Sequence, residues 1–126
     1  MQDQPSTREL VEATRDFLRD VAMPQLEPRA AFLARVAANA LDIVQRELDI
    51  APAANAEERQ RLTALLGQDG SLEELNRELC KRIRSDEFNL ETSGLYDHLW
   101  ETTLTKVAID QPKYSAYQRA LQEQAE

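Results

Sequence analysis

The stretch from Pro28 to Ile50, PRAAFLARVAANALDIVQRELDI, most constrains what this chain can fold into. Its apolar residues recur every three or four positions, which is the spacing of one face of an α-helix. Its many alanines favour a helix because they lose no side-chain rotamer freedom. Pro28 suits a first helical turn, and Pro52 predicts an exit because proline disfavours helical geometry in the residue before it. The sequence therefore predicts a long central helix over about residues 28–50.

A polar stripe runs along this predicted helix, and it consists of Arg35, Asn39, Asp42, Arg46 and Asp49. The spacing of the stripe brings opposite charges within reach of one another along the helix. One interpretation is a solvated edge with weak ion pairs. The other is a polar seam under a neighbouring helix, where Asn39 sets the register or, with Arg35 and Asp42, binds a ligand.

Shorter helices are predicted on either side of the central one. Ser6 with Glu9, and Ser71 with Glu74, have the spacing of a capping box, in which each residue satisfies a free backbone donor of the other. The first helix should stop near Pro24. The link from there to Pro28 is short, so this helix and the central one should be antiparallel neighbours.

The remainder of the chain is predicted as helices and connecting loops. We expect a loop over 51–55, a helix over about 56–66 that ends at Gly67, and a helix after Ser71 whose buried face includes Leu72, Leu75, Leu79 and Ile83. A loop over 85–92 should be held down by Phe88 and Leu90. Thr92 or Ser93 should cap a helix that runs to about Asp110, and a short terminal helix should follow.

These elements predict an all-α fold. No stretch of five residues alternates between apolar and polar, so no strand is expected. A length of 126 residues fits one domain. We therefore predict a single-domain bundle of five or six helices over 1–126, packed around the helix at 28–50, with residues 1–5 and 122–126 frayed.

Charge and composition exclude several classes of partner. The net charge is −8, with 23 acidic and 15 basic residues, whereas a nucleic-acid binder needs Lys and Arg to displace counterions from phosphate. An anionic membrane surface is disfavoured for the same reason. The chain has no apolar run long enough to span a membrane and no basic start followed by an apolar core, so we expect no membrane partner and a cytoplasmic location.

Residues with reactive or metal-binding side chains are few. The chain has one histidine, His98, and one cysteine, Cys80, and a zinc site usually draws several such ligands. Leu95 stands where a di-iron bundle would have the glutamate of its Glu-x-x-His motif. We expect His98 to be a partly exposed helix residue near Glu101, and Cys80 to be a buried, inert thiol beside the leucines. No catalytic residue, metal or cofactor is predicted, and we expect no enzymatic activity.

Tyr96 and Trp100 stand four positions apart, so they share one face of the predicted helix. Such a pair usually belongs to the core, where the tryptophan N–H finds one partner. It could instead line a ligand pocket. The two residues are therefore kept, with Arg35, Asn39 and Asp42, as candidate ligand or interface residues.

Four stretches together resemble a family of small, uncharacterised bacterial helical domains. They are ELVEATRDFL near the N-terminus, RVAANALDIVQREL, LNRELCKRIR and KVAIDQPKY at 106–114. The resemblance covers about Pro5 to Tyr117, and it carries over no catalytic residue. It implies a context, because members of the family are often encoded near enzymes resembling aminoglycoside phosphotransferases or acyl-CoA dehydrogenases.

Three hypotheses about function follow. The leading one is a non-enzymatic accessory or protein-interaction module that could form a homodimer and that serves one of those neighbouring enzymes. The second is a bundle that binds a small acyl or CoA-like ligand between its helices, lined by Trp100, Tyr96, Phe32 and the basic cluster at 77–84. The third is an enzyme with a site around His98 and the carboxylates nearby, and this hypothesis would require His98 to lie in a cleft.

Overall fold

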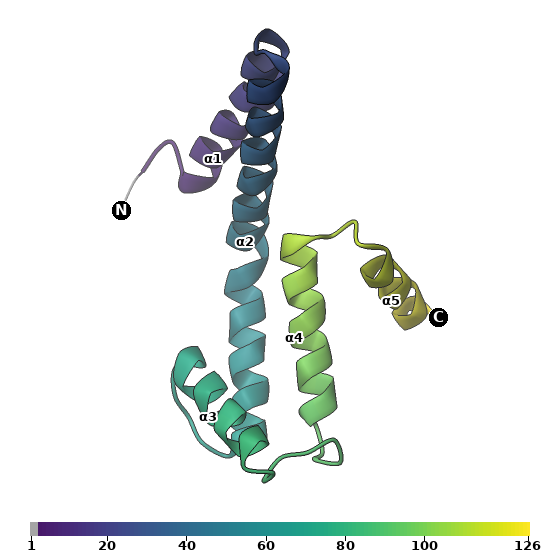
Figure 1. Ribbon diagram of the computed structural model, residues 1–126. Helices are drawn as coiled ribbons and strands as arrows, with labels where there is room; N and C mark the ends of the chain where they lie inside the picture. Colours follow the sequence, from purple (N-terminus) through teal and green to yellow (C-terminus); the bar gives the residue numbers. More distant parts are fainter. Residues whose placement is uncertain (1–2) are drawn as a thin grey trace. The chain divides into compact units, whose positions relative to one another are not determined.

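The structure is a computed structural model that describes residues 3–126, and every regular element in that range is helical (Figure 1). The elements are α1 (Thr7–Asp16), the π-helical η1 (Phe17–Ala22), the 3-10 turn η2 (Met23–Gln25), α2 (Pro28–Leu66), α3 (Leu72–Arg84), α4 (Leu95–Asp110) and α5 (Ser115–Ala125). This confirms the prediction of an all-α fold with one long helix. Internal contacts divide the chain into unit 1 (Met1–Asp49) and unit 2 (Ile50–Glu126), which are described separately.

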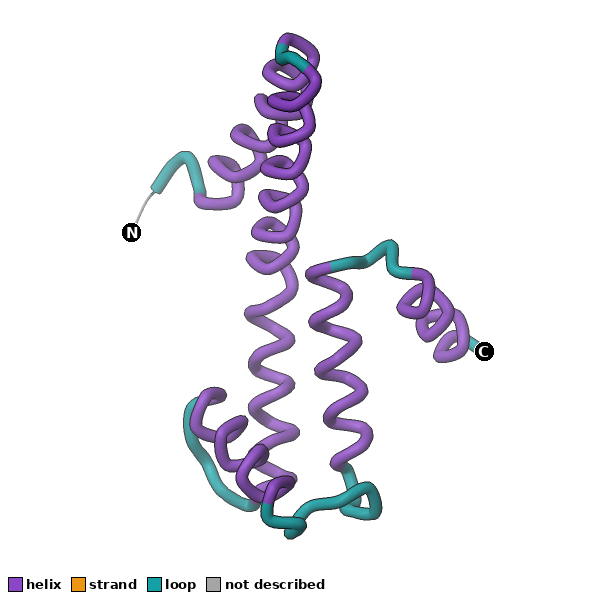
Figure 2. Tube along the Cα trace, in the orientation of Figure 1, coloured by secondary structure: helices purple, strands orange, loops and turns teal. Residues whose placement is uncertain are grey.

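The long helix α2 does not end where the sequence predicted. It continues through Pro52, so the predicted loop at 51–55 and the separate helix at 56–66 are wrong (Figure 2). A proline inside a helix removes one backbone hydrogen bond and costs about 3 kcal/mol. Alanines at positions 51, 53, 54 and 56 favour the helix on both sides of it, and the proline itself is exposed to solvent.

Unit 1 is an antiparallel pair formed by α1–η1–η2 and the first part of α2. The predicted capping box is present, with Ser6 Oγ accepting from the Glu9 N–H and the Glu9 carboxylate accepting from the Ser6 N–H. The helix departs from α geometry before Pro24, which has no N–H to continue the pattern. Arg8 at the start of α1 donates to Asp49, and Arg19 further along the same arm donates to Asn39, which comes earlier in α2. The two arms therefore run antiparallel, as the short link predicted.

Unit 2 is built on leucines. Leu62 and Leu66 of α2, Leu75 and Leu79 of α3, and Leu95 at the start of α4 form one buried cluster, and Leu65, Leu72 and Phe88 pack against it. The second capping box, between Ser71 and Glu74, begins α3 as predicted. Gly67 ends α2 with φ +68°, the left-handed conformation that glycine adopts without strain.

Several local expectations in unit 2 are wrong. Cys80 is exposed, because it lies about 100° around α3 from Leu79 and faces away from the leucine cluster. Leu90 is 92% exposed and does not hold the loop down, whereas Phe88 does and also lies under the Arg82 guanidinium. Neither Thr92 nor Ser93 caps α4; Gly94 occupies the cap position, and no side chain bonds to the free N–H groups.

The two ends of the chain differ in how much of them the structure describes. The predicted frayed segment at 1–5 includes Met1 and Gln2, which lie outside the described residues. At the other end, α5 continues to Ala125, and the fraying of 122–126 stays a prediction. Among the described residues, no helix combines the length and the hydrophobicity that crossing a membrane requires. That the whole chain forms a single domain stays a prediction.

Candidate functional site

The predicted polar stripe of α2 lies against α1 and η1 within unit 1. Asp42 accepts hydrogen bonds from Arg19 at 2.8 Å and from Arg15 at 3.4 Å, and the same Arg19 donates to Asn39 at 3.1 Å. Arg35 is exposed and lies outside these contacts. Of the two interpretations, the seam against a neighbouring helix describes the half-buried Asp42. Asn39 bonds to Arg19 but is exposed, as is Arg35, so both lie at the solvated edge.

The electrostatics of this seam explain why Asp42 stays charged. Burial alone would raise the pKa of Asp42, but the hydrogen bond from Arg19 and the positive charges of Arg19, Arg15 and Arg46 outweigh burial, so the pKa lies below its usual value. A carboxylate with two arginine partners is already satisfied. The seam therefore acts chemically as a clasp between the two arms of unit 1, and its role as a ligand site stays a prediction.

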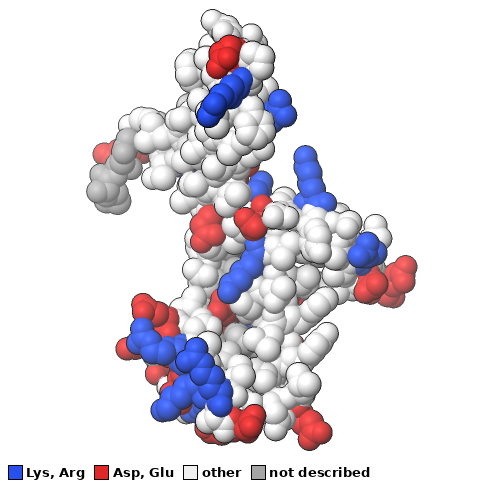
Figure 3. Space-filling view, viewed as in Figure 1, with Lys and Arg blue, Asp and Glu red and all other residues white. Residues whose placement is uncertain are grey.

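The side of α2 in unit 1 that faces away from α1 is apolar and exposed. Ala34 and Ala38 are buried on the inner side, whereas large apolar residues on the outer side are well exposed. The exposed side chains are Phe32 (56%), Leu33 (56%), Val36 (48%) and Val44 (43%). In the space-filling view, most of the visible surface of unit 1 carries no charged group (Figure 3). We call Phe32, Leu33, Val36, Ala40, Ile43 and Val44 the apolar face of unit 1.

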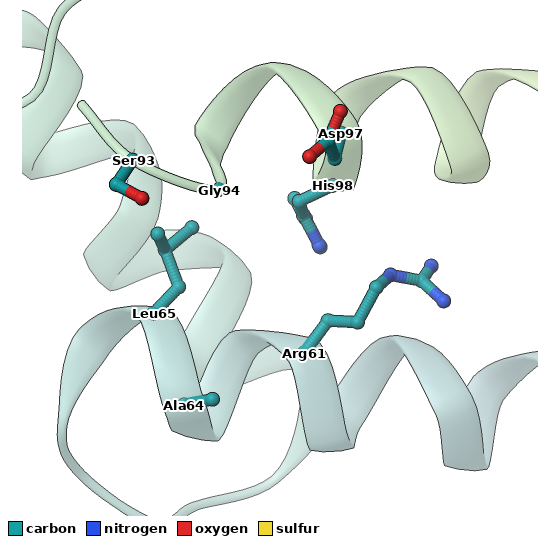
Figure 4. Close-up of a pocket in the computed structure, with 7 residues that line it drawn as sticks. All are labelled: Arg61, Ala64, Leu65, Ser93, Gly94, Asp97 and His98. Carbon is teal, nitrogen blue, oxygen red and sulfur yellow. The ribbon is translucent and has the colours of Figure 1, made fainter. Parts of the chain in front are cut away.

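His98 is the most buried ionisable group that the structure describes, with only 2% of its surface exposed. The expectation of a partly exposed histidine is therefore wrong. His98 points from α4 toward α2 and lines a cleft of about 330 Å³ (Figure 4). Arg61 enters the same cleft from α2, and Ser93, Gly94 and Asp97 line its other side.

Two polar atoms at this cleft have no hydrogen-bond partner in the structure, namely Nδ1 of His98 and Nε of Arg61. A buried polar atom without a partner is costly, so such atoms mark places where water or a ligand group can bind. Burial lowers the pKa of His98, the charge of Arg61 lowers it further, and Glu58 opposes them only in part. The buried position therefore favours the neutral form of His98.

Ser93, Asp97 and His98 are the residue types of a hydrolytic triad, and all three line the same cleft. In a triad, the carboxylate accepts a hydrogen bond from the histidine Nδ1–H and so fixes the tautomer and the orientation of the ring. Here Nδ1 of His98 bonds to nothing. The three side chains therefore do not form a triad, although His98 does lie in a cleft, as the third hypothesis required.

Trp100 lies at a different cavity, between α4 and α5. This cavity measures about 130 Å³, and apolar and aromatic side chains line it, including Trp100, Leu104, Val107 and Tyr117. Tyr96 is outside this lining; it stacks on Trp100 with ring centroids 6.3 Å apart and is 64% exposed. The usual core role does not hold for this pair, because Trp100 is itself 38% exposed.

Arg61 was not among the candidate residues predicted from the sequence, and His98 was predicted to be more exposed than it is. The sequence favoured a core position for Tyr96 and Trp100, but both are exposed, as is Leu99 between them. His98 stands one helical turn after the buried Leu95 and shares its face. That spacing was visible in the sequence and was the available signal. Among the residues that the structure describes, no group of three or more His, Cys, Asp or Glu could hold a metal ion.

Comparison with known proteins gives one match. A family model described as a domain of unknown function (DUF6285) matches residues 24–114, which is most of the chain. No curated protein and no solved structure matches the chain.

Proposed function

The chain belongs to the DUF6285 family, whose description assigns no activity, and from this premise we propose a non-enzymatic helical module that binds other proteins. The observation that carries the proposal is the apolar face of unit 1. Monomeric soluble proteins rarely expose a continuous apolar patch of this kind unless it meets a partner. The residues at its centre are large and aliphatic, as in helix-to-helix interfaces.

A second apolar stripe supports the same proposal. On α1 and η1, Leu10, Phe17 and Val21 are each more than two-fifths exposed and share one side of the helix. Unit 1 is thus apolar on the outside of both arms, while its inner surface is closed by the clasp of Arg15, Arg19 and Asp42. A pair of helices with this pattern gains stability by burying an outer face against another molecule.

The resemblance of the sequence suggests which partners to test first. We infer an accessory role in the cytoplasm beside an enzyme of the phosphotransferase-like or acyl-CoA-dehydrogenase-like kind. The acidic net charge of −8 would favour a partner with a basic surface.

The test is co-expression of the tagged full chain with each of the two enzymes, followed by co-purification. The variant Val36→Asp places a charge at the centre of the apolar face and should abolish every association that uses it. Arg35→Glu, on the same helix but off this face, is the control and should leave the association intact. The proposal is wrong if Val36→Asp is folded and still assembles as the wild type does.

A second candidate function is the binding of a small acyl group, and the apolar cavity beside Trp100 favours it. A cavity of about 130 Å³ with an almost wholly apolar lining matches the end of an acyl chain. The basic cluster of α3 is largely engaged in the protein, since Arg77 pairs with Glu73 and Arg82 with Glu78. In this second function, the apolar end of the acyl ligand would therefore bind in the cavity, and the basic cluster would not be needed to bind a phosphate.

Trp100 makes this candidate directly measurable because it is the only tryptophan. Titration with fatty acids and acyl-CoAs should shift its fluorescence in a saturable way. Ala116→Leu would place a larger side chain in the cavity and should abolish the shift, whereas Ala53→Leu, on an exposed position of α2, should not. A fluorescence spectrum that ignores the whole panel would remove this candidate.

A further inference from the structure

The apolar face of unit 1 carries one charge near each end. Arg29 stands in the first turn of α2 and Glu47 close to the end of unit 1, and both are exposed. They are separated by a whole number of turns at 3.6 residues per turn, so they lie on one line along the helix. Val36 and Ala40 lie between them, within about 20° of that line.

Neither end charge has a partner among residues 3–126. Among the described residues, the ion pairs of unit 1 join Arg8, Arg15 and Arg19 to acidic groups, and Arg29 and Glu47 take part in none of them. Opposite charges therefore flank an exposed apolar surface and remain available to another molecule.

Arg29 and Glu47 are equally distant from Ala38. A second copy of α2 laid antiparallel across the face, with a two-fold axis at the level of Ala38, would bring each Arg29 next to Glu47 of the other copy. This is the isologous arrangement, in which residue i meets residue j and j meets i. A single charge pattern on one chain thus becomes two complementary ion pairs in a dimer.

The same register also matches the apolar side chains. On one flank of the line, Leu33 would meet Val44 of the second copy, and on the other flank Phe32 would meet Ile43. Near the axis, Val36 would meet Ala40, whose small side chain lets two helices approach closely. All six side chains are exposed or half-buried in the single chain, so the pairing would bury apolar surface along the whole face.

We propose that the apolar face of unit 1 is the interface of an antiparallel homodimer, with Arg29 of each copy paired to Glu47 of the other. This inference rests on the proposed function and names its partner as a second copy of the chain. The two charges of this face are complementary to those of an identical face turned end to end. This self-complementarity favours a second copy of the chain over an unrelated protein. The second apolar stripe, formed by Leu10, Phe17 and Val21 on α1 and η1, has no such pair of opposite charges at its ends.

The experiment measures the dimerisation of the full chain by sedimentation equilibrium and native mass spectrometry. The wild type should be a dimer. Arg29→Glu and Glu47→Arg should each weaken the dimer by about tenfold, because each variant sets like charges opposite one another at two places. The double variant should restore the affinity to about that of the wild type. Arg35→Glu is the matched control and should change nothing.

A mixing experiment sharpens the test. In an equimolar mixture of the Arg29→Glu and Glu47→Arg chains, a heterodimer has two favourable ion pairs, whereas each homodimer has two repulsive ones. The two chains differ in mass, so native mass spectrometry resolves the three species, and the heterodimer should dominate. A statistical mixture would overturn the proposed register.

The remaining outcomes separate this proposal from the broader function. If the wild type is a dimer that Val36→Asp dissociates but the charge variants do not affect, the register is wrong and the protein-binding function stands. A monomeric wild type overturns the homodimer. In that case, the thiol reactivity of Val36→Cys in a Cys80→Ser background decides the rest: rapid labelling leaves the face open to another protein, and protection shows that the chain covers it itself.

Discussion

Units 1 and 2 bury different side chains. Among the described residues, the buried apolar groups of unit 1 are Ala34 and Ala38, whereas unit 2 buries Leu62, Leu66, Leu75, Leu79 and Leu95 in one cluster. Two helices side by side can cover only a narrow strip of each other, and alanines fill that strip. In unit 2, α3 and the start of α4 both pack against α2, and these three segments together enclose larger side chains. The apolar surface that unit 1 leaves exposed is the consequence, and it is why we place the binding surface there.

The largest effect should come from the leucine cluster of unit 2. Leu75→Ala removes a fully buried side chain and should lower the free energy of unfolding by about 2–5 kcal/mol. Leu90→Ala is the control, because Leu90 is 92% exposed, and it should change stability by less than about 0.5 kcal/mol. Urea denaturation followed by Trp100 fluorescence measures both. Similar effects of the two variants would contradict the assignment of the core.

A smaller effect is expected from the clasp of unit 1. Asp42→Asn removes the charge that Arg15 and Arg19 share and should cost about 1–2 kcal/mol. The control is Asp20→Asn, because Asp20 is exposed on η1, in the other arm of unit 1, and makes no ion pair among the described residues. Far-UV circular dichroism reports on all helices, while Trp100 reports on unit 2. A loss seen mainly by circular dichroism would show that unit 1 unfolds separately, and equal shifts in both signals would show that the units unfold together.

The clasp also predicts a pH dependence. The pKa of Asp42 is lower in the folded chain than its ordinary value of 3.8, so its charge stabilises the fold above that pH. This contribution is lost as the pH falls through the folded pKa. The difference in stability between the wild type and Asp42→Asn should therefore shrink below about pH 3.8. A difference that stays constant down to strongly acidic pH would contradict the assigned charge.

Much of the fold could be predicted because its signals are local. The capping boxes at Ser6 and Ser71 and the stop at Gly67 each depend on a few adjacent residues, and all three are present. Pro52 was misjudged because its cost competes with the helix propensity of the alanines around it. A rule about one residue cannot decide that balance.

The candidate site was harder to predict, because it depends on which helix face meets which neighbour. In α4, the face of Leu95 and His98 is buried, while the face of Trp100, Leu104 and Val107 lines the cavity next to α5. A helix with partners on two sides has apolar residues on both, so its periodicity does not identify the most buried one. The apolar face of unit 1 was mispredicted in the opposite direction. Its pattern predicted burial, and the single chain leaves it exposed.

Each unit contains one capping box, and both boxes consist of a serine and a glutamate, so the same substitution can be compared in the two units. Ser6→Ala and Ser71→Ala each remove the side chain that accepts a bond from the first turn, and each should cost about 1 kcal/mol. Circular dichroism should detect both losses, and Trp100 fluorescence should detect the loss at Ser71 more strongly. Ser115→Ala is the control, since Ser115 is not the cap of α5. A larger response of Trp100 to Ser6→Ala than to Ser71→Ala would remove the distinction between the units.

The smallest expected effect is a change in stability with pH near neutrality. It comes from His98, which lies in unit 2. The pKa of His98 is lower in the folded chain than its ordinary value of 6.5, because burial and Arg61 disfavour the charged form. Below pH 6.5 the unfolded chain therefore takes up a proton that the folded chain resists, and stability should fall as the pH drops from there. His98→Gln should lack this slope, whatever its stability at higher pH. A slope that persists in His98→Gln would mean that another group titrates, whereas its loss would show that the buried imidazole is neutral and that the fold of unit 2 depends on keeping it so.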